Sequence, residues 1–211
     1  MTARFLVLEG VDGSGKTTQA KALVSWLQDL GRNPVHFREP GTTALGERLR
    51  AMLLEPGRES WNPRSEAMLF FAARRELLLK EVRPALEAGS DVVCERFTPS
   101  SLAYQGQDPA DADFILELDR IVVGDMQPDR VLLLDLPVSE SLQRIGLRQE
   151  QTGESADGMG ERGADFLRAV RQGYLRYAEA RPNQTTLLNV SGMDAEAVEN
   201  AIRQDLEALL A

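Results

Sequence analysis

The chain has 211 residues, of which 43% are hydrophobic and 27% charged, and its formal net charge is −9. This length and apolar content predict one domain spanning residues 1–211, and the acidic balance argues against sequence-independent binding to nucleic acid or an anionic membrane. A single cysteine, Cys94, excludes a disulfide framework within the chain and fits a reducing compartment. We see no leader segment and no apolar run of the roughly 20 residues that a membrane helix needs, so we expect a cytoplasmic protein without a membrane partner.

The strongest motif is a glycine-rich loop near the start, reading GVDGSGKTT over residues 10–18. It holds the full Gly-x-x-x-x-Gly-Lys-Thr phosphate-loop pattern, with a strand-like run at 5–8 before it and a helical pattern after it. The glycines let the backbone wrap a phosphate, and the free N–H groups at the helix start favour the same anion. An ordinary glycine turn is disfavoured, because the motif has the strand before it and the helix after it that a phosphate loop requires. The loop residues predicted to bind the phosphates of a nucleotide are Gly10, Val11, Asp12, Gly13, Ser14, Gly15, Lys16, Thr17 and Thr18.

The next elements alternate between helix and strand. Apolar residues at helical spacing over 20–30 predict a helix that Gly31 ends. Residues 34–37 read as a second strand, and residues 44–54 return to a helical pattern. The lone histidine, His36, has no metal-like partners nearby in the sequence and is interpreted as structural.

A long helix is predicted to follow. Asn62-Pro63 is a helix-start signature, with an Asn cap and a proline in the first turn. The helix runs towards Pro84, where we expect a kink or a break. Phe70 and Arg74 lie four residues apart and hence one turn apart on it. Spacing alone leaves two possibilities open: Phe70 and Arg74 act together in binding, or Phe70 packs in the core and Arg74 is a solvated charge.

A third strand is predicted at residues 91–94. Its continuous apolar run indicates a central, parallel strand, in which Cys94 is a small buried residue. Glu95 and Arg96 follow at its carboxyl end, where open α/β sheets place their ligands. Residues 97–106 then form a polar segment.

Another helix is predicted after Asp108-Pro109, and a fourth strand at residues 131–135, followed by a helix that carries Leu142 and Ile145. The predicted buried face of the first of these helices consists of Phe114, Ile115, Leu118, Ile121 and Val122.

Residues 146–163 hold five glycines and few apolar residues, which predicts a mobile lid. Helical periodicity resumes over 166–177, a fifth strand is expected at 186–190, and a last helix over 198–209. Alternating strands and helices predict an α/β fold of the P-loop NTPase type. We expect a doubly wound, five-stranded parallel sheet with helices on both faces.

Several stretches together resemble one family, the bacterial thymidylate kinases, over nearly the whole length. The phosphate loop is shared by many NTPases, whereas Arg38-Glu39-Pro40 and Ala103-Tyr104-Gln105-Gly106 are far more specific. The resemblance implies a Mg²⁺-dependent homodimer that transfers the ATP γ-phosphate to dTMP and gives ADP and dTDP. The stretches that carry it are residues 9–18, Arg38-Glu39-Pro40-Gly41, Phe70-Phe71-Ala72-Ala73-Arg74, Glu95-Arg96-Phe97 with residues 100–106, and Pro128-Asp129.

The resemblance also implies roles at the two phosphate sites. Lys16 and the loop amides hold the donor phosphates, and Thr17 holds Mg²⁺. Asp12 matches a loop carboxylate that accepts a hydrogen bond from the acceptor's 3′-hydroxyl. Arg38 and Arg96 match residues that grip the acceptor phosphate, a task suited to the planar guanidinium fork.

Five further positions match residues around the acceptor's base and sugar. Phe70 matches a ring that stacks on thymine, and Arg74 matches a donor to a thymine carbonyl. Ser101 and Gln105 match polar positions near the base edge. Tyr104 matches a ring packed against the deoxyribose.

Two departures from the family pattern stand out. Glu95-Arg96 stands where relatives usually have Asp-Arg; the longer Glu95 carboxylate can still bind Mg²⁺, directly or through water. In the lid, Asp157-Gly158-Met159-Gly160 stands where relatives commonly show Asp-Arg-x-Glu, so that arginine and glutamate are missing.

The variable loop positions 11–14 contain no arginine, so the loop cannot supply the cation that stabilises the transition state. The chain is similar in this respect to family members without a loop arginine, which take that cation from the lid. Arg144 and Arg148 share one helix face at i, i+4 spacing and match family arginines in order and spacing. The resemblance therefore implies that Arg148 acts in catalysis and Arg144 steadies ATP, with Arg162 in reserve; the alternative is that all three are solvated charges on a flexible loop. The predicted catalytic residues are Lys16, Arg148, Asp12 and Arg96.

Two alternatives remain at this point. A kinase for another nucleoside monophosphate would share the architecture but not the base pocket. A nucleotide-gated switch would need a residue that orients water. No Asn-Lys-x-Asp base-reading motif is visible, and the arginines opposite the loop provide a second anion site that a switch does not require.

Overall fold

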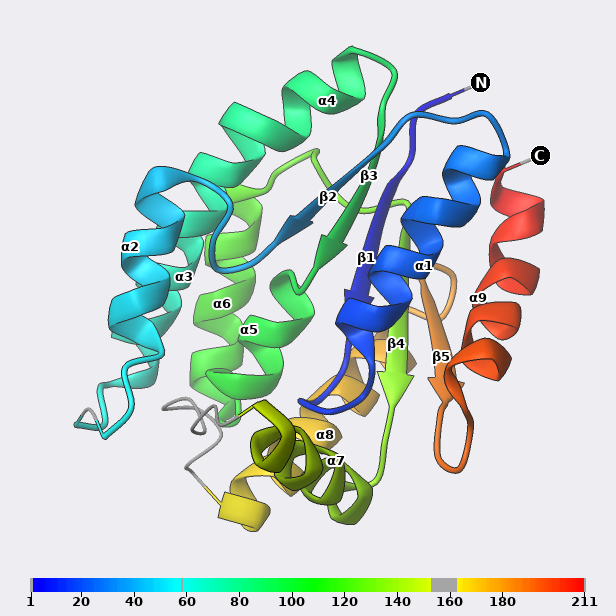
Figure 1. Ribbon diagram of the computed structural model, residues 1–211. Coiled ribbons are helices and arrows are strands. Elements are labelled where there is room, and N and C mark those ends of the chain that lie inside the picture. The colour runs from blue at the N-terminus through cyan, green and yellow to red at the C-terminus, as the bar shows by residue number, and fades with distance from the viewer. Residues whose placement is uncertain (1, 58, 153–162, 211) are drawn as a thin grey trace.

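The computed structural model describes residues 2–57, 59–152 and 163–210, and these residues form a five-stranded parallel sheet between helices (Figure 1). The strand order is β2-β3-β1-β4-β5, so the first strand is central and all carboxyl ends meet at one edge. This confirms the predicted doubly wound sheet. The strands are β1 (Phe5–Glu9), β2 (Pro34–Arg38), β3 (Asp91–Glu95), β4 (Arg130–Asp135) and β5 (Thr185–Asn189).

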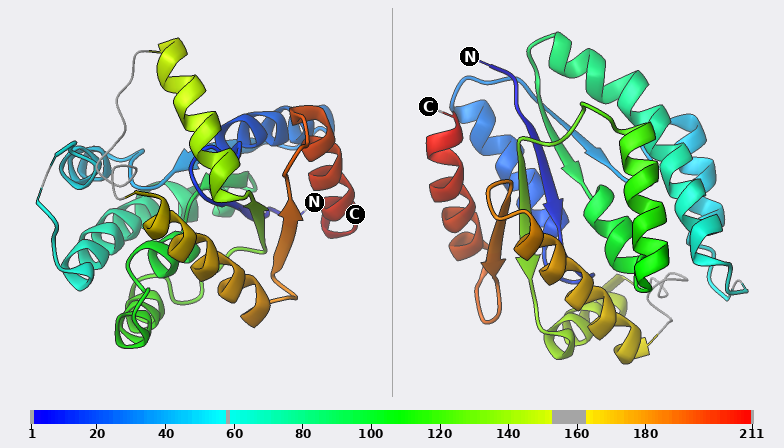
Figure 2. Two further views of the ribbon diagram at one scale, coloured as in Figure 1. Left: turned by 90° about the horizontal axis from the view of Figure 1, so that it is seen from below. Right: turned by 180° about the vertical axis from the view of Figure 1, so that it is seen from behind.

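Helices cover both faces of the sheet. α1 and α9 lie together on one face, and α3, α6 and α8 lie on the other (Figure 2). None of the described helices is long and apolar enough to cross a membrane. The helices are α1 (Lys16–Asp29), α2 (Ala44–Leu53), α3 (Pro63–Leu77), the π-helical η1 (Leu78–Val82), α4 (Arg83–Glu87), α5 (Thr98–Tyr104), α6 (Pro109–Val122), α7 (Val138–Thr152), α8 (Gly163–Ala180) and α9 (Ala195–Leu210).

The side chains of β1 divide the core into two clusters. Because successive strand residues point to opposite faces, Leu6 and Leu8 enter the cluster that includes residues of α1 and α9. Phe5 and Val7 enter the cluster that includes residues of α3 and α6. Cys94 is fully buried in the second cluster, as predicted. The central strand therefore fixes the position of the loop that follows it.

The long helix after Asn62 changes its hydrogen-bond pattern ahead of Pro84. The N–H of Arg83 donates to the carbonyl of Leu78, five residues back, and this wider turn forms η1. A proline has no N–H to continue an α-helical ladder and crowds the preceding turn. The predicted interruption is confirmed.

The structure adds one helix and contradicts one local expectation. The segment at 97–106, described from the sequence only as polar, contains a helix, α5, which begins at Thr98 with Pro99 in its first turn. Ile121 was expected on the buried face of α6, but 65% of it is exposed, whereas Ile115 on the same helix is buried.

The predicted lid begins later than its composition indicates. α7 continues through Gly146 to Thr152, because one glycine inside a helix costs only about 1 kcal/mol relative to alanine. Residues 153–162 of the predicted lid lie outside the described residues.

The amino end of the sheet is held by a buried ion pair. The Asp91 carboxylate accepts hydrogen bonds from Arg32 Nε (2.5 Å) and Nη2 (2.6 Å) and from the backbone N–H of Arg4 (2.8 Å). The side chains of Arg32 and Asp91 are only 5% and 2% exposed. One carboxylate thus links the start of β3 to the segments before β1 and β2.

We predict that Asp91→Ala lowers the free energy of unfolding by about 3–5 kcal/mol, because it leaves the Arg32 cation buried without its partner. Urea denaturation followed by circular dichroism measures the loss. Arg120→Ala is the control, because its pair with Glu117 is largely exposed and such pairs contribute about 0–1 kcal/mol. Equal losses in the two variants would contradict the prediction.

Candidate active site

The phosphate loop leaves β1 at the carboxyl edge of the sheet and enters α1. Gly10 must be glycine, because a Cβ at its φ of +139° would lie 2.4 Å from the carbonyl oxygen of Leu134. Gly15 caps α1 in the left-handed region. Lys16 Nζ donates to the carbonyls of Gly10 and Val11, each at 2.9 Å. The loop therefore gathers amides, a helix N-terminus and one ammonium group around a single point.

Thr17 and Glu95 bring two hard oxygen donors together beside the loop. Thr17 Oγ1 donates to Glu95 Oε2 at 2.5 Å, and His36 Nε2 lies 3.0 Å from Glu95 Oε1. Burial disfavours the charged form, but the hydrogen bonds from His36 and Thr17 hold the pKa of Glu95 below its ordinary value. Hydroxyl and carboxylate oxygens suit Mg²⁺, which takes few protein ligands beside substrate phosphates.

Arg96 lies where the loop faces the acceptor side. Its φ of +67° is unusual for a residue other than glycine and costs of order 1–3 kcal/mol. Its Nη2 donates to Asp12 Oδ1 at 2.5 Å, and its Nη1 donates to the hydroxyls of Ser100 and Tyr174, each at 3.1 Å. Burial would raise the pKa of Asp12, but the cations Arg96 and Lys16 beside it lower that pKa to about 2.

A fully buried carboxylate, Glu9, holds this arrangement from behind. Its Oε1 accepts the backbone N–H groups of Phe97 (2.7 Å) and Ser100 (3.1 Å). Its Oε2 accepts the hydroxyls of Ser100 (2.7 Å) and Tyr174 (3.1 Å). Glu9 thus caps the N-terminus of α5 from a distant strand, and it fixes the two hydroxyls that hold Arg96.

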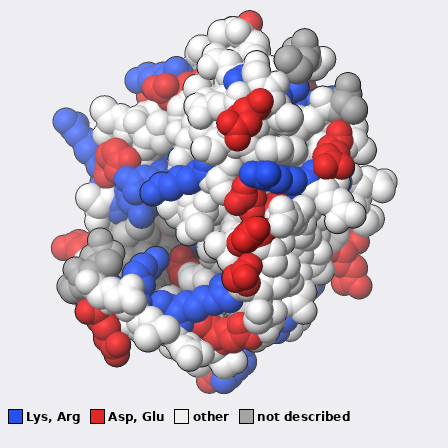
Figure 3. Space-filling model, turned by 45° about the vertical axis from the view of Figure 1, so that its right-hand side comes forward, with Lys and Arg blue, Asp and Glu red and all other residues white. Residues whose placement is uncertain are grey.

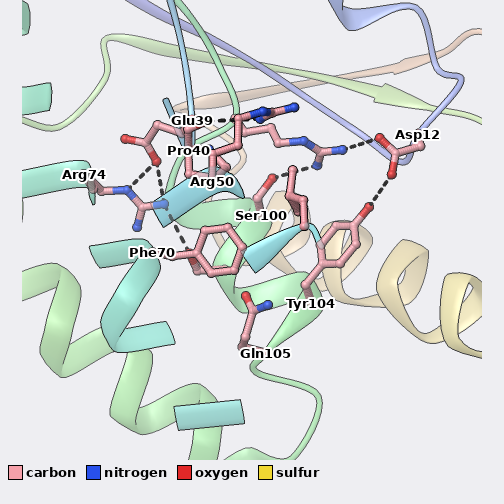
Figure 4. A pocket seen from close by; sticks show the side chains of 12 residues that line it. Asp12, Glu39, Pro40, Arg50, Phe70, Arg74, Ser100, Tyr104 and Gln105 are labelled. Atoms are coloured by element: carbon pink, nitrogen blue, oxygen red, sulfur yellow. Dashed lines mark hydrogen bonds and ion pairs between the residues drawn. The ribbon is translucent and has the colours of Figure 1, made fainter. Parts of the chain in front are cut away.

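A pocket opens beside Arg96, between α2, α3 and α5 (Figure 4). Most of the residues predicted to bind the acceptor line it, so the structure brings them together. Arg74, Phe70, Tyr104 and Gln105 surround the space, and Asp12 lies at its end towards the phosphate loop. The lining residues are Asp12, Glu39, Pro40, Arg50, Leu54, Phe70, Arg74, Arg96, Ser100, Ser101, Tyr104 and Gln105.

Arg74 is 1% exposed, which excludes the alternative of a solvated charge. Its guanidinium lies 4.3 Å from the ring centre of Phe71 and 4.9 Å from that of Phe97. Its Nε donates to Glu39 Oε2 at 2.7 Å, and its Nη2 donates to Ser101 Oγ at 3.2 Å. Burial raises the pKa of Glu39 to about 7, although Arg74 opposes the shift.

Arg38 is not among the residues that line the pocket. Its half-exposed side chain pairs with Glu47 at 3.1 Å, so its role at the acceptor phosphate stays a prediction. Arg50 of α2 lines the pocket instead, with Nη1 donating to the carbonyl of Pro40 at 3.0 Å. The sequence analysis missed Arg50, Glu39 and Ser100 as site residues. Arg50 carries no signal in sequence, because its helical pattern indicates only a polar face.

α7 carries the two arginines predicted to act on ATP. Arg144 Nη2 lies 3.4 Å from the carbonyl oxygen of Val190 and 3.7 Å from Glu140. Arg148 lies one turn further along and is exposed. Arg162 and the residues 157–160 of the altered stretch lie outside the described residues.

Cations gather locally on this acidic chain. Figure 3 shows lysine and arginine side chains around a hollow on one face of the molecule, against a net charge of −9. A local cluster of guanidinium groups can bind an anion despite an unfavourable overall field.

The fold and the site together define a class. A phosphate loop and a second, arginine-containing pocket share the carboxyl edge of one parallel sheet, and the Asp12–Arg96 pair joins them. This is the arrangement of a P-loop kinase that acts on a small phosphorylated acceptor.

Comparison with known proteins gives the family. A family model described as thymidylate kinase matches residues 8–202. A thymidylate kinase from Desulfovibrio desulfuricans is 41% identical, covering 98% of this chain and 96% of the relative. One from Synechococcus sp. is 41% identical over the whole of both chains. The crystal structure of thymidylate kinase from Ehrlichia chaffeensis superposes with a TM-score of 0.77 at 29% identity, covering 98% of this chain and 100% of that one. The chain belongs to the thymidylate kinase family.

We predict that Tyr174→Phe lowers kcat/KM for the acceptor by roughly tenfold or more, because hydrogen bonds to charged groups contribute about 1.5–3 kcal/mol. The change removes a hydroxyl that touches both Arg96 and Glu9. Tyr177→Phe is the matched control: the same change on the same buried helix face, at a residue that is not part of the Arg96–Glu9 network. Steady-state kinetics with both variants measure the effect; equal losses would show that Tyr174 acts only through folding.

We predict that Glu39 makes stability fall with rising pH. Below its ordinary pKa of 4.5 the carboxyl is protonated in both states, whereas between 4.5 and about 7 only the folded protein keeps the proton. The folded state therefore loses up to roughly 3 kcal/mol across this window. Urea unfolding of wild type and Glu39→Gln from pH 4.5 to 7.5 measures it: the wild type should lose stability relative to the variant. A pH-independent difference would contradict the raised pKa.

Proposed function

We propose that the chain transfers the γ-phosphate of ATP to dTMP, giving ADP and dTDP. One observation carries the proposal: the phosphate loop and the pocket around the buried Arg74 open at the same sheet edge, with the Asp12–Arg96 pair between them. Membership of the thymidylate kinase family supports the choice of dTMP over other monophosphates.

On the donor side, the loop amides and Lys16 bind the ATP phosphates. Catalysis of phosphoryl transfer rests mainly on positioning and on stabilising charge. Thr17 and Glu95 fit Mg²⁺, because a hydroxyl and a carboxylate meet at 2.5 Å beside the loop. When bound, the metal neutralises charge on the donor phosphates.

On the acceptor side, Arg96 grips the dTMP phosphate through its planar fork, and its hydroxyl partners hold the fork in place before dTMP arrives. Asp12, ionised because its pKa is about 2, accepts a hydrogen bond from the 3′-hydroxyl. Arg38 can reach the same phosphate only if it releases Glu47. That ion pair is exposed and therefore weak.

The base lies between Phe70 and the polar groups of α3 and α5. Phe70 stacks on thymine, an interaction worth about 1–3 kcal/mol per base. Arg74 donates to a thymine carbonyl from a guanidinium that Glu39 already holds. Ser101 and Gln105 lie at the base edge, while the ring of Tyr104 packs against the deoxyribose.

The assembly and the location belong to the same proposal: a homodimer in the cytoplasm. Exposed apolar side chains on the neighbouring helices α3 and α6 support a dimer, namely Met68 (50%), Leu116 (39%) and Ile121 (65%). Light scattering at several concentrations reports the assembly directly.

We predict that ADP release at fixed Mg-ATP depends on dTMP and is faster with it than with dUMP, UMP, dCMP, dGMP or AMP. Lys16→Ala should abolish most of this turnover and leave the circular dichroism spectrum unchanged, since the Lys16 ammonium contacts the phosphate loop rather than the core. Release without any acceptor dependence would favour a nucleotide-gated switch. A preference for another monophosphate would favour a different kinase.

We predict that Arg148→Ala lowers kcat more than Arg144→Ala or Arg162→Ala, with little change in dTMP binding. An arginine that stabilises charge on the transferring phosphoryl group contributes roughly 10³–10⁵ in rate in comparable systems. The assay uses saturating dTMP and Mg-ATP, and a larger loss at Arg162 would overturn this assignment.

A further inference from the structure

His36, the only histidine in the chain, is not part of the phosphate loop or the acceptor pocket. It lies on the edge strand β2, and its side chain is 29% exposed. Its side chain contacts Glu95 of the neighbouring strand β3: Nε2 lies 3.0 Å from Glu95 Oε1. Because an ionised carboxylate only accepts hydrogen bonds, Nε2 carries the proton in this contact.

The register of the sheet makes this contact possible. β2 and β3 are parallel, and His36 pairs with Val93 while Arg38 pairs with Glu95. Alternate residues of a strand share a face, so Glu95 lies on the same face as Val93, the partner of His36. The His36 and Glu95 side chains therefore lie on one face of the sheet, offset by two residues along the strands. Val93 belongs to the core cluster that includes residues of α1, and α1 carries Thr17.

Glu95 is consequently held at both carboxylate oxygens. Oε2 accepts from Thr17 Oγ1 at 2.5 Å, while Oε1 faces His36. A glutamate has several rotatable bonds and loses conformational entropy when it is fixed. A second hydrogen bond at the far oxygen fixes the rotamer in advance, which lowers the cost of ordering it when a ligand binds.

We propose that His36 is a positioning residue for the metal: it holds Glu95 so that the carboxylate faces Thr17 and the donor phosphates. The inference rests on the proposed function only in assigning Mg²⁺ to Thr17 and Glu95. Hydrogen-bond partners of metal ligands typically change metal affinity by about 10–100-fold when they are removed.

The test measures ADP dissociation constants by calorimetry in saturating Mg²⁺ and in EDTA. The dissociation constant in EDTA divided by that in Mg²⁺ reports how strongly the metal increases ADP affinity. This ratio requires neither dTMP nor turnover. His36→Phe keeps a ring but has no donor, and should lower the ratio about tenfold while leaving the ADP affinity in EDTA unchanged. His36→Gln retains an N–H donor and should restore most of the ratio.

Val35→Ala is the control on the same strand, because Val35 packs against the other core cluster. It should lower the melting temperature but leave the ratio unchanged. The proposal would be overturned if the ratio were unchanged in His36→Phe or fell equally in Val35→Ala. His36 would then only stabilise the position of β2. Dependence of ADP release on dTMP in the wild type tests the proposed function separately.

A spectroscopic measurement gives a second readout. All imidazole NMR signals of this chain come from His36. Replacing Mg²⁺ by paramagnetic Mn²⁺ in the ADP complex should broaden those signals strongly in the wild type. Sharp signals would place the metal away from Glu95 and would likewise overturn the proposal.

Discussion

The site depends on one buried carboxylate, that of Glu9 at the end of the central strand. Removing a carboxylate from water is costly unless its oxygens find donors, and Glu9 finds four, two from the backbone and two from hydroxyls. Those donors come from α5, from its N-terminal flank and from α8. A single side chain at the end of β1, where the phosphate loop begins, therefore connects that loop to the start of α5 and to α8.

The strained backbone of Arg96 follows from this constraint. With Phe97 and Ser100 held by Glu9, the chain turns through a positive φ at Arg96, and the guanidinium is directed at Asp12. The anion site exists before a ligand arrives, which avoids much of the entropic cost of ordering a long side chain. The ionised Asp12 carboxylate holds the guanidinium in place when no substrate phosphate is bound. An acidic protein can in this way present a fixed cation to a phosphate.

The fold was largely predictable because its signals are local. Short strand-like runs, helical periodicity and a proline at position 84 act on their own neighbourhood, and the structure confirms them. Predictions failed where a distant partner decides the outcome. The helix α5 was missed because its N-terminal donors are satisfied by Glu9, far away in the chain. The exposure of Ile121 depends on which helix face meets α3, and spacing within α6 does not reveal that.

The sequence by itself determined the phosphate loop, the succession of the strands and of most helices along the chain, and the family, because each depends on contiguous residues with fixed spacing. Only the tertiary structure decided which charges are paired. It buried Arg74 against Glu39, directed Arg38 outward to Glu47, brought Arg50 into the pocket and set His36 beside Glu95. These pairings join residues of different elements, and a long side chain can reach several partners from one backbone position. Their energies depend on burial and on distances of a few ångströms, which arise only when the sheet and its helices are assembled.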